Sequence, residues 1–132
     1  MIESLNRVSL LGAMSVIDLL EIGWRPGETE LANARHVVEW AILPSEGKVP
    51  YRIMGLAQGP GFKNTTFVAA VIAIDFNERW AWIWDEWVVI GNQIQGSPCF
   101  DPIEIRRTGA AWLLDELRRL PVSHQLGLPR TR

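Results

Sequence analysis

The chain has few of the residues that build disulfides, metal sites and catalytic centres. Of its 132 residues, one is cysteine and two are histidine. A single cysteine excludes an internal disulfide, and a thiolate metal site needs several more ligands than the sequence places near Cys99. We therefore predict no bound metal and no cofactor, and a reducing, cytoplasmic location.

Long hydrophobic runs are also missing. A helix needs about 20 continuous apolar residues to cross a membrane, and no segment of the chain reaches that length. The apolar run 8–17 resembles the core of a signal peptide, but Glu3 precedes it, Asp18 and Glu21 close it, and no small-x-small cleavage site follows. We expect a helix of a cytosolic protein that has no contact with a membrane.

The chain also lacks a large excess of positive or of negative charge. The formal net charge is −2 and 21% of the residues are charged, so the chain has no bulk attraction to nucleic acid or to an anionic membrane. A hydrophobic content of 48% over this length is typical of one globular domain that buries its own core. We predict a single domain over residues 1–121 and a flexible tail at 122–132.

Apolar segments separated by turn signals occupy the middle of the chain. Segments 36–43, 50–58 and 65–76 are rich in strand-forming residues, and a proline, a glycine loop or a polar turn follows each. The connections are short, which favours an antiparallel meander over crossover units. Segment 65–76 is apolar on both faces, so we expect a central strand in which alternation puts Ile72 and Ile74 on the same face.

Helices are predicted at both ends, which makes the expected fold class α+β. Residues 2–22 have a polar or small residue at every third position, a row that winds around a helix. Such a helix packs on more than one element, or on a partner at one end, or it bends at Gly12 over a single core. Asp101 and Pro102 are typical of a helix start, and an apolar stripe extends from there to Leu120. We expect an antiparallel sheet of about four strands packed with both helices.

Four of the seven tryptophans fall within residues 80–87. On a strand, alternate residues share a face, so three rings would form one apolar shelf: Trp80, Trp82 and Trp84. Val88 and Ile90 would continue that face, and Trp87 would point the other way. On a helix, Trp80 and Trp84 would join Trp87 in one stripe, and Trp82 would be left out. We favour a strand over 80–90, because Trp, Val and Ile prefer strands.

The tryptophan shelf, Trp80, Trp82 and Trp84, has two interpretations. The terminal helices cover it, as one face of an antiparallel sheet requires, or it is a partly exposed platform for the side chains of a partner protein. The glycine loop at 59–64 is a plausible second contact. The predicted partner-binding residues are therefore the three tryptophans of the shelf together with Phe62 and Lys63.

Several short motifs follow one another in a definite order between residues 31 and 91. They are Leu31, Ala34, Trp40, Gly55, a Gly-Pro loop at 59–61, Thr65, Ala73-Ile74-Asp75, and Trp80-Ala81 leading to Gly91. In this order the segment resembles an uncharacterised family of small bacterial proteins, a domain of unknown function. The chain departs from that pattern where Gln58-Gly59-Pro60 replaces Gly-His-Pro and where Trp82-Ile83-Trp84 replaces an Arg-Thr region. The resemblance implies a small α+β meander, and the members' likeness to accessory genes of plasmids and phages favours an interaction role.

The favoured function is a non-enzymatic protein-binding module. Its specific form is a phage or mobile-element inhibitor that occupies a surface of a host protein, as anti-CRISPR proteins do. The expected partner is a protein of unknown identity, and a homodimer through the N-terminal helix is a separate expectation. His36 and His124 lack acidic or cysteine neighbours at ligand spacing, so we expect neither to be catalytic. Cys99 is either a small buried hydrophobe or a reactive thiol before a helix.

Two alternatives remain open. A small nucleic-acid-binding regulator would use the arginines of the C-terminal helix, Arg106, Arg107, Arg118 and Arg119, and its affinity would fall steeply with salt. A small enzyme or ligand binder would use Cys99 or His36 in a pocket between the sheet and the helices. Nucleic acid is a less favoured partner than protein. Stacking of nucleobases on the tryptophan shelf is the weaker version of the platform, because Asp85 and Glu86 would repel phosphates.

Overall fold

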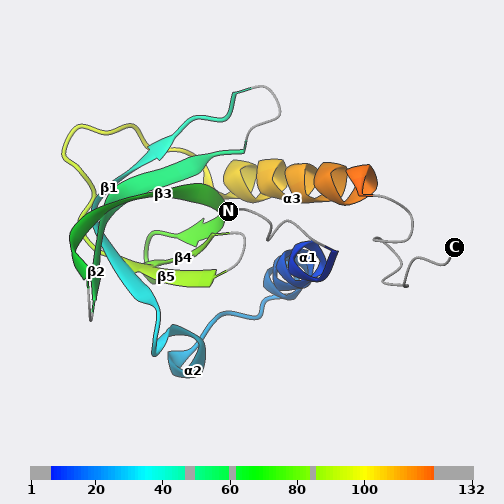
Figure 1. Cartoon of the computed structure of the whole chain (residues 1–132), viewed down its shortest axis with the longest axis horizontal. Helices are drawn as coiled ribbons and strands as arrows, with labels where there is room; N and C mark the ends of the chain where they lie inside the picture. The colour runs from blue at the N-terminus through cyan, green and yellow to red at the C-terminus, as the bar shows by residue number, and fades with distance from the viewer. Residues whose placement is uncertain (1–6, 47–49, 60–61, 84–85, 121–132) are drawn as a thin grey trace, which may run out of the picture.

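The fold is α+β, with five strands where about four were expected. The computed structural model describes residues 7–46, 50–59, 62–83 and 86–120, and the predicted tail at 122–132 lies outside them. The helices are α1 (Arg7–Glu21), α2 (Glu28–Leu31) and α3 (Pro102–Arg119). The strands are β1 (Arg35–Leu43), β2 (Arg52–Gly59), β3 (Phe62–Asp75), β4 (Trp80–Ile83) and β5 (Glu86–Ile90). Figure 1 shows the strands gathered at one end and α1 and α3 at the other.

The strands follow one another around a closed barrel. Each pairs with the next in antiparallel orientation, as the predicted meander requires. In a meander of five strands the first and the last run in the same direction, and β1 pairs with β5 in parallel, with His36 opposite Val89. The Arg35 Nε donates to Glu86 Oε2 across this closure at 2.8 Å. The sheet therefore has no free edge along the closed pairs.

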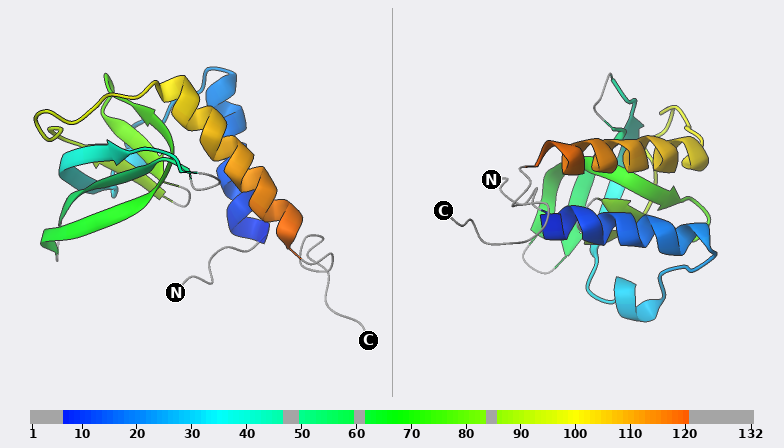
Figure 2. Two further views of the ribbon diagram at one scale, coloured as in Figure 1. Left: turned by 90° about the horizontal axis from the view of Figure 1, so that it is seen from above. Right: turned by 90° about the vertical axis from the view of Figure 1, so that its right-hand side faces the viewer.

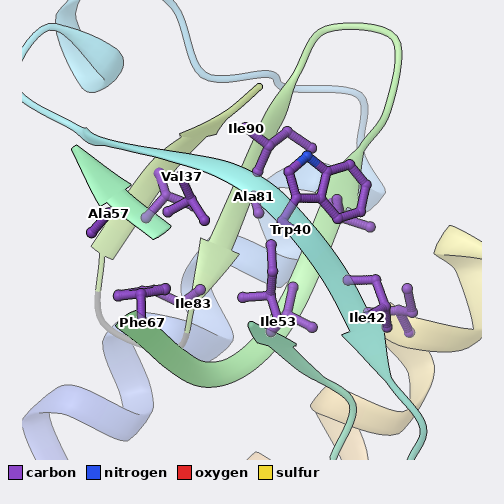
Figure 3. Packing of buried hydrophobic residues seen from close by; sticks show 13 residues of the cluster. Val37, Trp40, Ile42, Ile53, Ala57, Phe67, Ala81, Ile83 and Ile90 are labelled. Carbon is purple, nitrogen blue, oxygen red and sulfur yellow. The ribbon is translucent and has the colours of Figure 1, made fainter. Parts of the chain in front are cut away.

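Side chains from all five strands fill the barrel (Figure 3). Apolar residues form this first core: Val37, Trp40, Ile42, Ile53, Ala57, Phe67, Val71, Ile74, Ala81, Ile83, Val88 and Ile90. Ile105 of α3 joins them and has no exposed surface. The N-terminal turn of α3 thus belongs to the barrel core.

A bulge in β1 accounts for Gly55. Two residues of β1, Glu39 and Trp40, stand opposite this one glycine, and Glu39 has a φ of 50°. A Cβ on Gly55 would lie 2.7 Å from Cγ1 of Val37 and 2.9 Å from the carbonyl oxygen of Val38. Only glycine fits there, and the bulge lets the indole of Trp40 enter the barrel (Figure 3).

The predicted alternation of faces on β3 holds as far as Ile72 and is wrong from Ala73 onward. The β3–β4 register shifts between Val71 and Ala73. Ile72 and Ala73 therefore both lie in a second core, between the barrel and the helices α1 and α3, and Ile74 returns to the barrel core. A bulge inserts one residue into the two-residue repeat, and every face after it changes.

Segment 80–90 is two strands rather than one. β4 and β5 are antiparallel, with Trp82 opposite Trp87 and Trp80 opposite Val89. Residues paired in this way point to the same side of a sheet, so Trp87 joins the face of Trp82. The prediction that Trp87 points away, and that Val88 and Ile90 share the tryptophan face, is wrong because the chain reverses between the strands.

Two antiparallel helices cover one side of the barrel. α1 and α3 lie side by side in front of the strands (Figure 2). A Cβ on Gly109 would lie 3.0 Å from the Cα of Ile72, so the backbone of α3 lies directly on β3. α1 contributes one straight buried stripe, formed by Leu10, Ala13, Ile17 and Leu20. The stripe does not wind, which agrees with packing over a single core.

The predicted start of α3 is confirmed. Asp101 is the N-cap and its carboxylate accepts from the backbone N–H of Ile103 at 3.0 Å, with Pro102 in the first turn. Three residues of the predicted apolar stripe are fully packed: Ile105, Gly109 and Leu113. Among the described residues, no helix combines the length and the apolar character that a membrane span needs.

Candidate interaction surface

Two tryptophans of the predicted shelf lie inside the protein. Trp80 is 3% exposed and Trp82 is 9% exposed, and both pack in the second core with α1 and Leu113. Of the two interpretations of the shelf, the one in which the terminal helices cover it describes these rings. A partner could reach them only if the helices moved, so their role in partner binding stays a prediction.

Trp87 is the centre of the aromatic cluster. Its ring centroid lies 4.7 Å from that of Trp82, 5.4 Å from that of Trp80 and 5.9 Å from that of Trp24. Sequence reasoning missed this role because it placed Trp87 on the opposite face. Trp84 lies outside the described residues, and so do the side chains of Phe62 and Lys63.

The outward face of α1 carries a different apolar row. It consists of Val8, Gly12, Ser15, Leu19 and Ile22, all of them exposed. The steps of four, three, four and three residues give a mean period of 3.5, the spacing of a coiled-coil seam. Ile22 follows the last residue of α1, and its N–H still donates to the carbonyl oxygens of Asp18 and Leu19. We call this row the α1 seam.

The α1 seam is open and almost uncharged. Val8 is 75% exposed, Ile22 is 80% exposed and Leu19 is 39% exposed. A Cβ placed on Gly12 would have no atom within 4 Å, so the surface there is clear. Among the described residues of α1, the exposed charged side chains are Asp18 and Glu21, and both adjoin the C-terminal half of the seam. Contiguous exposed apolar surface is the feature that distinguishes interaction sites from scattered apolar residues.

The neighbouring helix extends the apolar surface. Ile103 of α3 is 53% exposed and Leu114 is 37% exposed. Arg106 Nε donates to Glu21 Oε2 at 2.8 Å and joins the start of α3 to the end of α1, which puts Ile103 at the same end of the helix pair as Ile22. Together the helices present a two-helix face with apolar residues along both of them.

The arginines of α3 are engaged in ion pairs. Arg106 pairs with Glu21, Arg107 pairs with Glu104, and Arg119 pairs with Asp115 and Glu116. Arg118 has an interaction of its own as well. The first two arginines and the last two are also separated by about 18 Å along the helix. The structure therefore does not bring the four together as one free cationic patch for phosphates.

The residues considered for chemistry stand apart from one another. His36 is exposed on β1, and His124 lies outside the described residues. Cys99 is exposed, so its interpretation as a small buried hydrophobe is wrong. Among the residues that the structure describes, no group of three or more His, Cys, Asp and Glu side chains could hold a metal ion.

Comparison with known proteins adds no relative. No family model matches the chain, and no curated protein and no solved structure is significantly similar to it. The resemblance of residues 31–91 to an uncharacterised bacterial family stays a prediction.

Proposed function

We propose that the protein is a non-enzymatic protein-binding module whose interface is the α1 seam and the adjoining edge of α3. The exposure of Val8, Leu19 and Ile22 at seam spacing on the face opposite the buried stripe carries this proposal. Each large apolar side chain that passes from water into an interface contributes up to about 1.5–3 kcal/mol. A helix that is apolar on two opposite faces uses one face for its own core and leaves the other for a partner.

The partner that fits the α1 seam is a helix with an apolar stripe of its own. Small residues at Gly12 and Ser15 let a second backbone come close, and the larger residues at the two ends of the seam hold it in register. The scarcity of charge on the seam favours a partner helix without a strongly charged face. A more specific form of the proposal is an inhibitor that occupies such a helix on a host protein.

A second copy of the chain also fits the α1 seam. Val8 and Ile22 lie equally far from Ser15, so an antiparallel copy centred on Ser15 would place Ile22 of one protomer over Val8 of the other and Leu19 close to Gly12. A two-fold interface requires this kind of self-complementarity. Light scattering during size-exclusion chromatography distinguishes the two occupants, because only self-association doubles the mass of the purified protein.

Quantitative affinity capture tests the proposal. The tagged protein, the double variant Val8→Asp with Ile22→Asp, and the control Val68→Asp are each used to capture proteins from a nuclease-treated bacterial lysate. Val68 is 50% exposed on β3, away from the seam. We expect a stoichiometric partner, or self-association, that the double variant loses and the control keeps. Equal capture by all three proteins, or capture of nucleic acid alone, would contradict the proposal.

A further inference from the structure

A cleft opens where one end of the barrel meets the segment that leads into α3. Its volume is about 520 Å³, within the range of about 300–1,000 Å³ that is typical of small-molecule sites. It is lined by Trp40, Phe76, Arg79, Ile90, Gly91, Asn92, Gln93, Cys99, Phe100 and Pro102. The barrel, the turn before β4 and the chain after β5 all contribute, so the cleft is built from parts that are distant in sequence.

Aromatic rings with fixed positions form the wall of the cleft. Trp40 and Phe76 are stacked, with centroids 5.8 Å apart and planes 7° from parallel. Trp40 Nε1 donates to the carbonyl oxygen of Gly91 at 2.8 Å, which fixes the indole. Phe100 packs edge-on against Tyr51, with centroids 5.2 Å apart. Flat, rigid aromatic surfaces favour a flat apolar ligand, because little conformational entropy is lost on binding.

Among the residues that the structure describes, Arg79 is the one charged residue that lines this cleft. Its backbone has a φ of 63°, a conformation that residues other than glycine seldom adopt. The turn holds it there: the N–H of Arg79 donates to the carbonyl oxygen of Asp75 at 2.9 Å, and the carbonyl of Arg79 accepts from Ile90 at 3.0 Å. Backbone strain that the surrounding structure maintains is often found at binding sites.

The charge of the cleft defines what it can hold. Within the described ranges, no carboxylate lines the cleft and Arg79 makes no ion pair. A guanidinium that is not neutralised by the protein itself binds carboxylates through paired N–H groups. Asn92 and Gln93 also line the cleft, and the side-chain amide of Gln93 donates to the carbonyl oxygen of Pro98 at 3.5 Å.

We propose that this cleft binds a small planar aromatic carboxylate. The ring lies against Phe76 and Phe100, and the carboxylate pairs with Arg79. Trp40, which is 4% exposed, stacks on Phe76 and holds it in place. Cys99 lies on the lining and is exposed, so a bound ligand covers its thiol. The proposal does not depend on the α1 seam, which uses none of these residues.

Calorimetry with 2-naphthoate tests the carboxylate and the ring together. The neutral 2-naphthalenemethanol serves as the matched ligand. We expect the naphthoate to bind the wild-type protein at least about tenfold more tightly than the alcohol, as a charge-assisted hydrogen bond provides. Arg79→Gln removes this preference, Arg79→Lys restores part of it, and the control Arg107→Gln on α3 leaves it unchanged.

Alkylation of Cys99 by N-ethylmaleimide reports where the naphthoate binds. Saturating naphthoate slows alkylation of the wild-type protein and of Arg107→Gln, but not of Arg79→Gln at the same concentration. Far-ultraviolet circular dichroism confirms that each variant is folded. Absence of naphthoate binding, equal binding by Arg79→Gln, or binding that leaves the alkylation rate unchanged would each overturn the proposal.

Discussion

The barrel interior and the helical layer, which is the core between the outer face of the barrel and helices α1 and α3, are both apolar. They differ in the hydrogen bonding of one buried indole N–H group in each. In the barrel, the indole N–H of Trp40 donates to the carbonyl of Gly91. In the helical layer, Nε1 of Trp82 is buried and has no acceptor among the described residues. The barrel closes its own sheet and fills its interior with side chains, although Nε of Arg52 on β2 is also buried without a partner in the described part of the chain. The helical layer packs one face of α1 and leaves the other exposed, which is why we assign the interaction to it.

The largest expected effect on stability comes from replacing Trp87, which lies on β5 and packs against the helical layer. Trp87 contacts three other indoles, so Trp87→Ala removes the centre of the cluster. We expect the free energy of unfolding to fall by about 3 kcal/mol or more, as for other large aromatic residues replaced by alanine. Urea denaturation followed by circular dichroism measures it. A loss below about 1 kcal/mol would show that α1 does not depend on this cluster.

The next effect tests the close approach of two strands in the barrel. Gly55→Ala places a Cβ against Cγ1 of Val37 and the carbonyl of Val38, and we expect a loss of about 1–3 kcal/mol from this overpacking. Gly12→Ala is the matched control, because the surface of α1 is open there. The control gains about 0.5–1 kcal/mol from helix propensity. Opposite signs in urea denaturation are the expected result, and equal signs would contradict the bulge geometry.

A pair of conservative variants compares the two indole N–H groups directly. Trp40→Phe removes a hydrogen bond and leaves the Gly91 carbonyl without that donor. Trp82→Phe removes an N–H that has no partner in the described part of the chain. We expect the first change to cost about 1 kcal/mol more than the second. Equal losses in thermal denaturation would indicate that Trp82 has an acceptor in solution.

The smallest expected effect is the ion pair that joins the two helices. The Arg106–Glu21 pair is partly exposed, with side-chain exposures of 25% and 56%. Such pairs contribute about 0.2–1 kcal/mol, so Arg106→Gln lowers stability by that amount and the difference shrinks in 1 M salt. A salt-independent loss above about 1 kcal/mol would assign a packing role to the stem of Arg106.

Local patterns in the sequence were enough to predict the element types. Asp101 and Pro102 define the start of α3 through local interactions, a side-chain cap and a fixed backbone angle, and the turn signals separate β1, β2 and β3. The reversal inside 80–90 was missed, because Trp84-Asp85 contains neither glycine nor asparagine to mark a hairpin. The bulge near Ile72 was missed because one inserted residue leaves no compositional trace.

The candidate site was harder to predict because it depends on which face of α1 packs inward. The polar row at every third residue predicts a stripe that winds around the helix, and this pattern hides the 3.5-residue spacing of the α1 seam. Val8, Leu19 and Ile22 carry the signal for that spacing. The sequence predicted the interface at the tryptophans, because large aromatic residues are common both in interfaces and in cores. Burial, which separates the two uses, follows from tertiary packing. The cleft at Arg79 has no sequence signal, since its lining comes from four separate segments.

Site-specific photocrosslinking tests the central claim most directly, namely that the barrel is a scaffold and the α1 seam is the interface. A benzophenone amino acid replaces Ser15 in one protein and Val68 in another, both at exposed positions. Irradiation in a bacterial lysate is followed by mass spectrometry of the adducts. The account predicts a single abundant adduct, with a partner protein or a second copy of the chain, at Ser15 and none at Val68. An adduct at Val68 and none at Ser15 would contradict it.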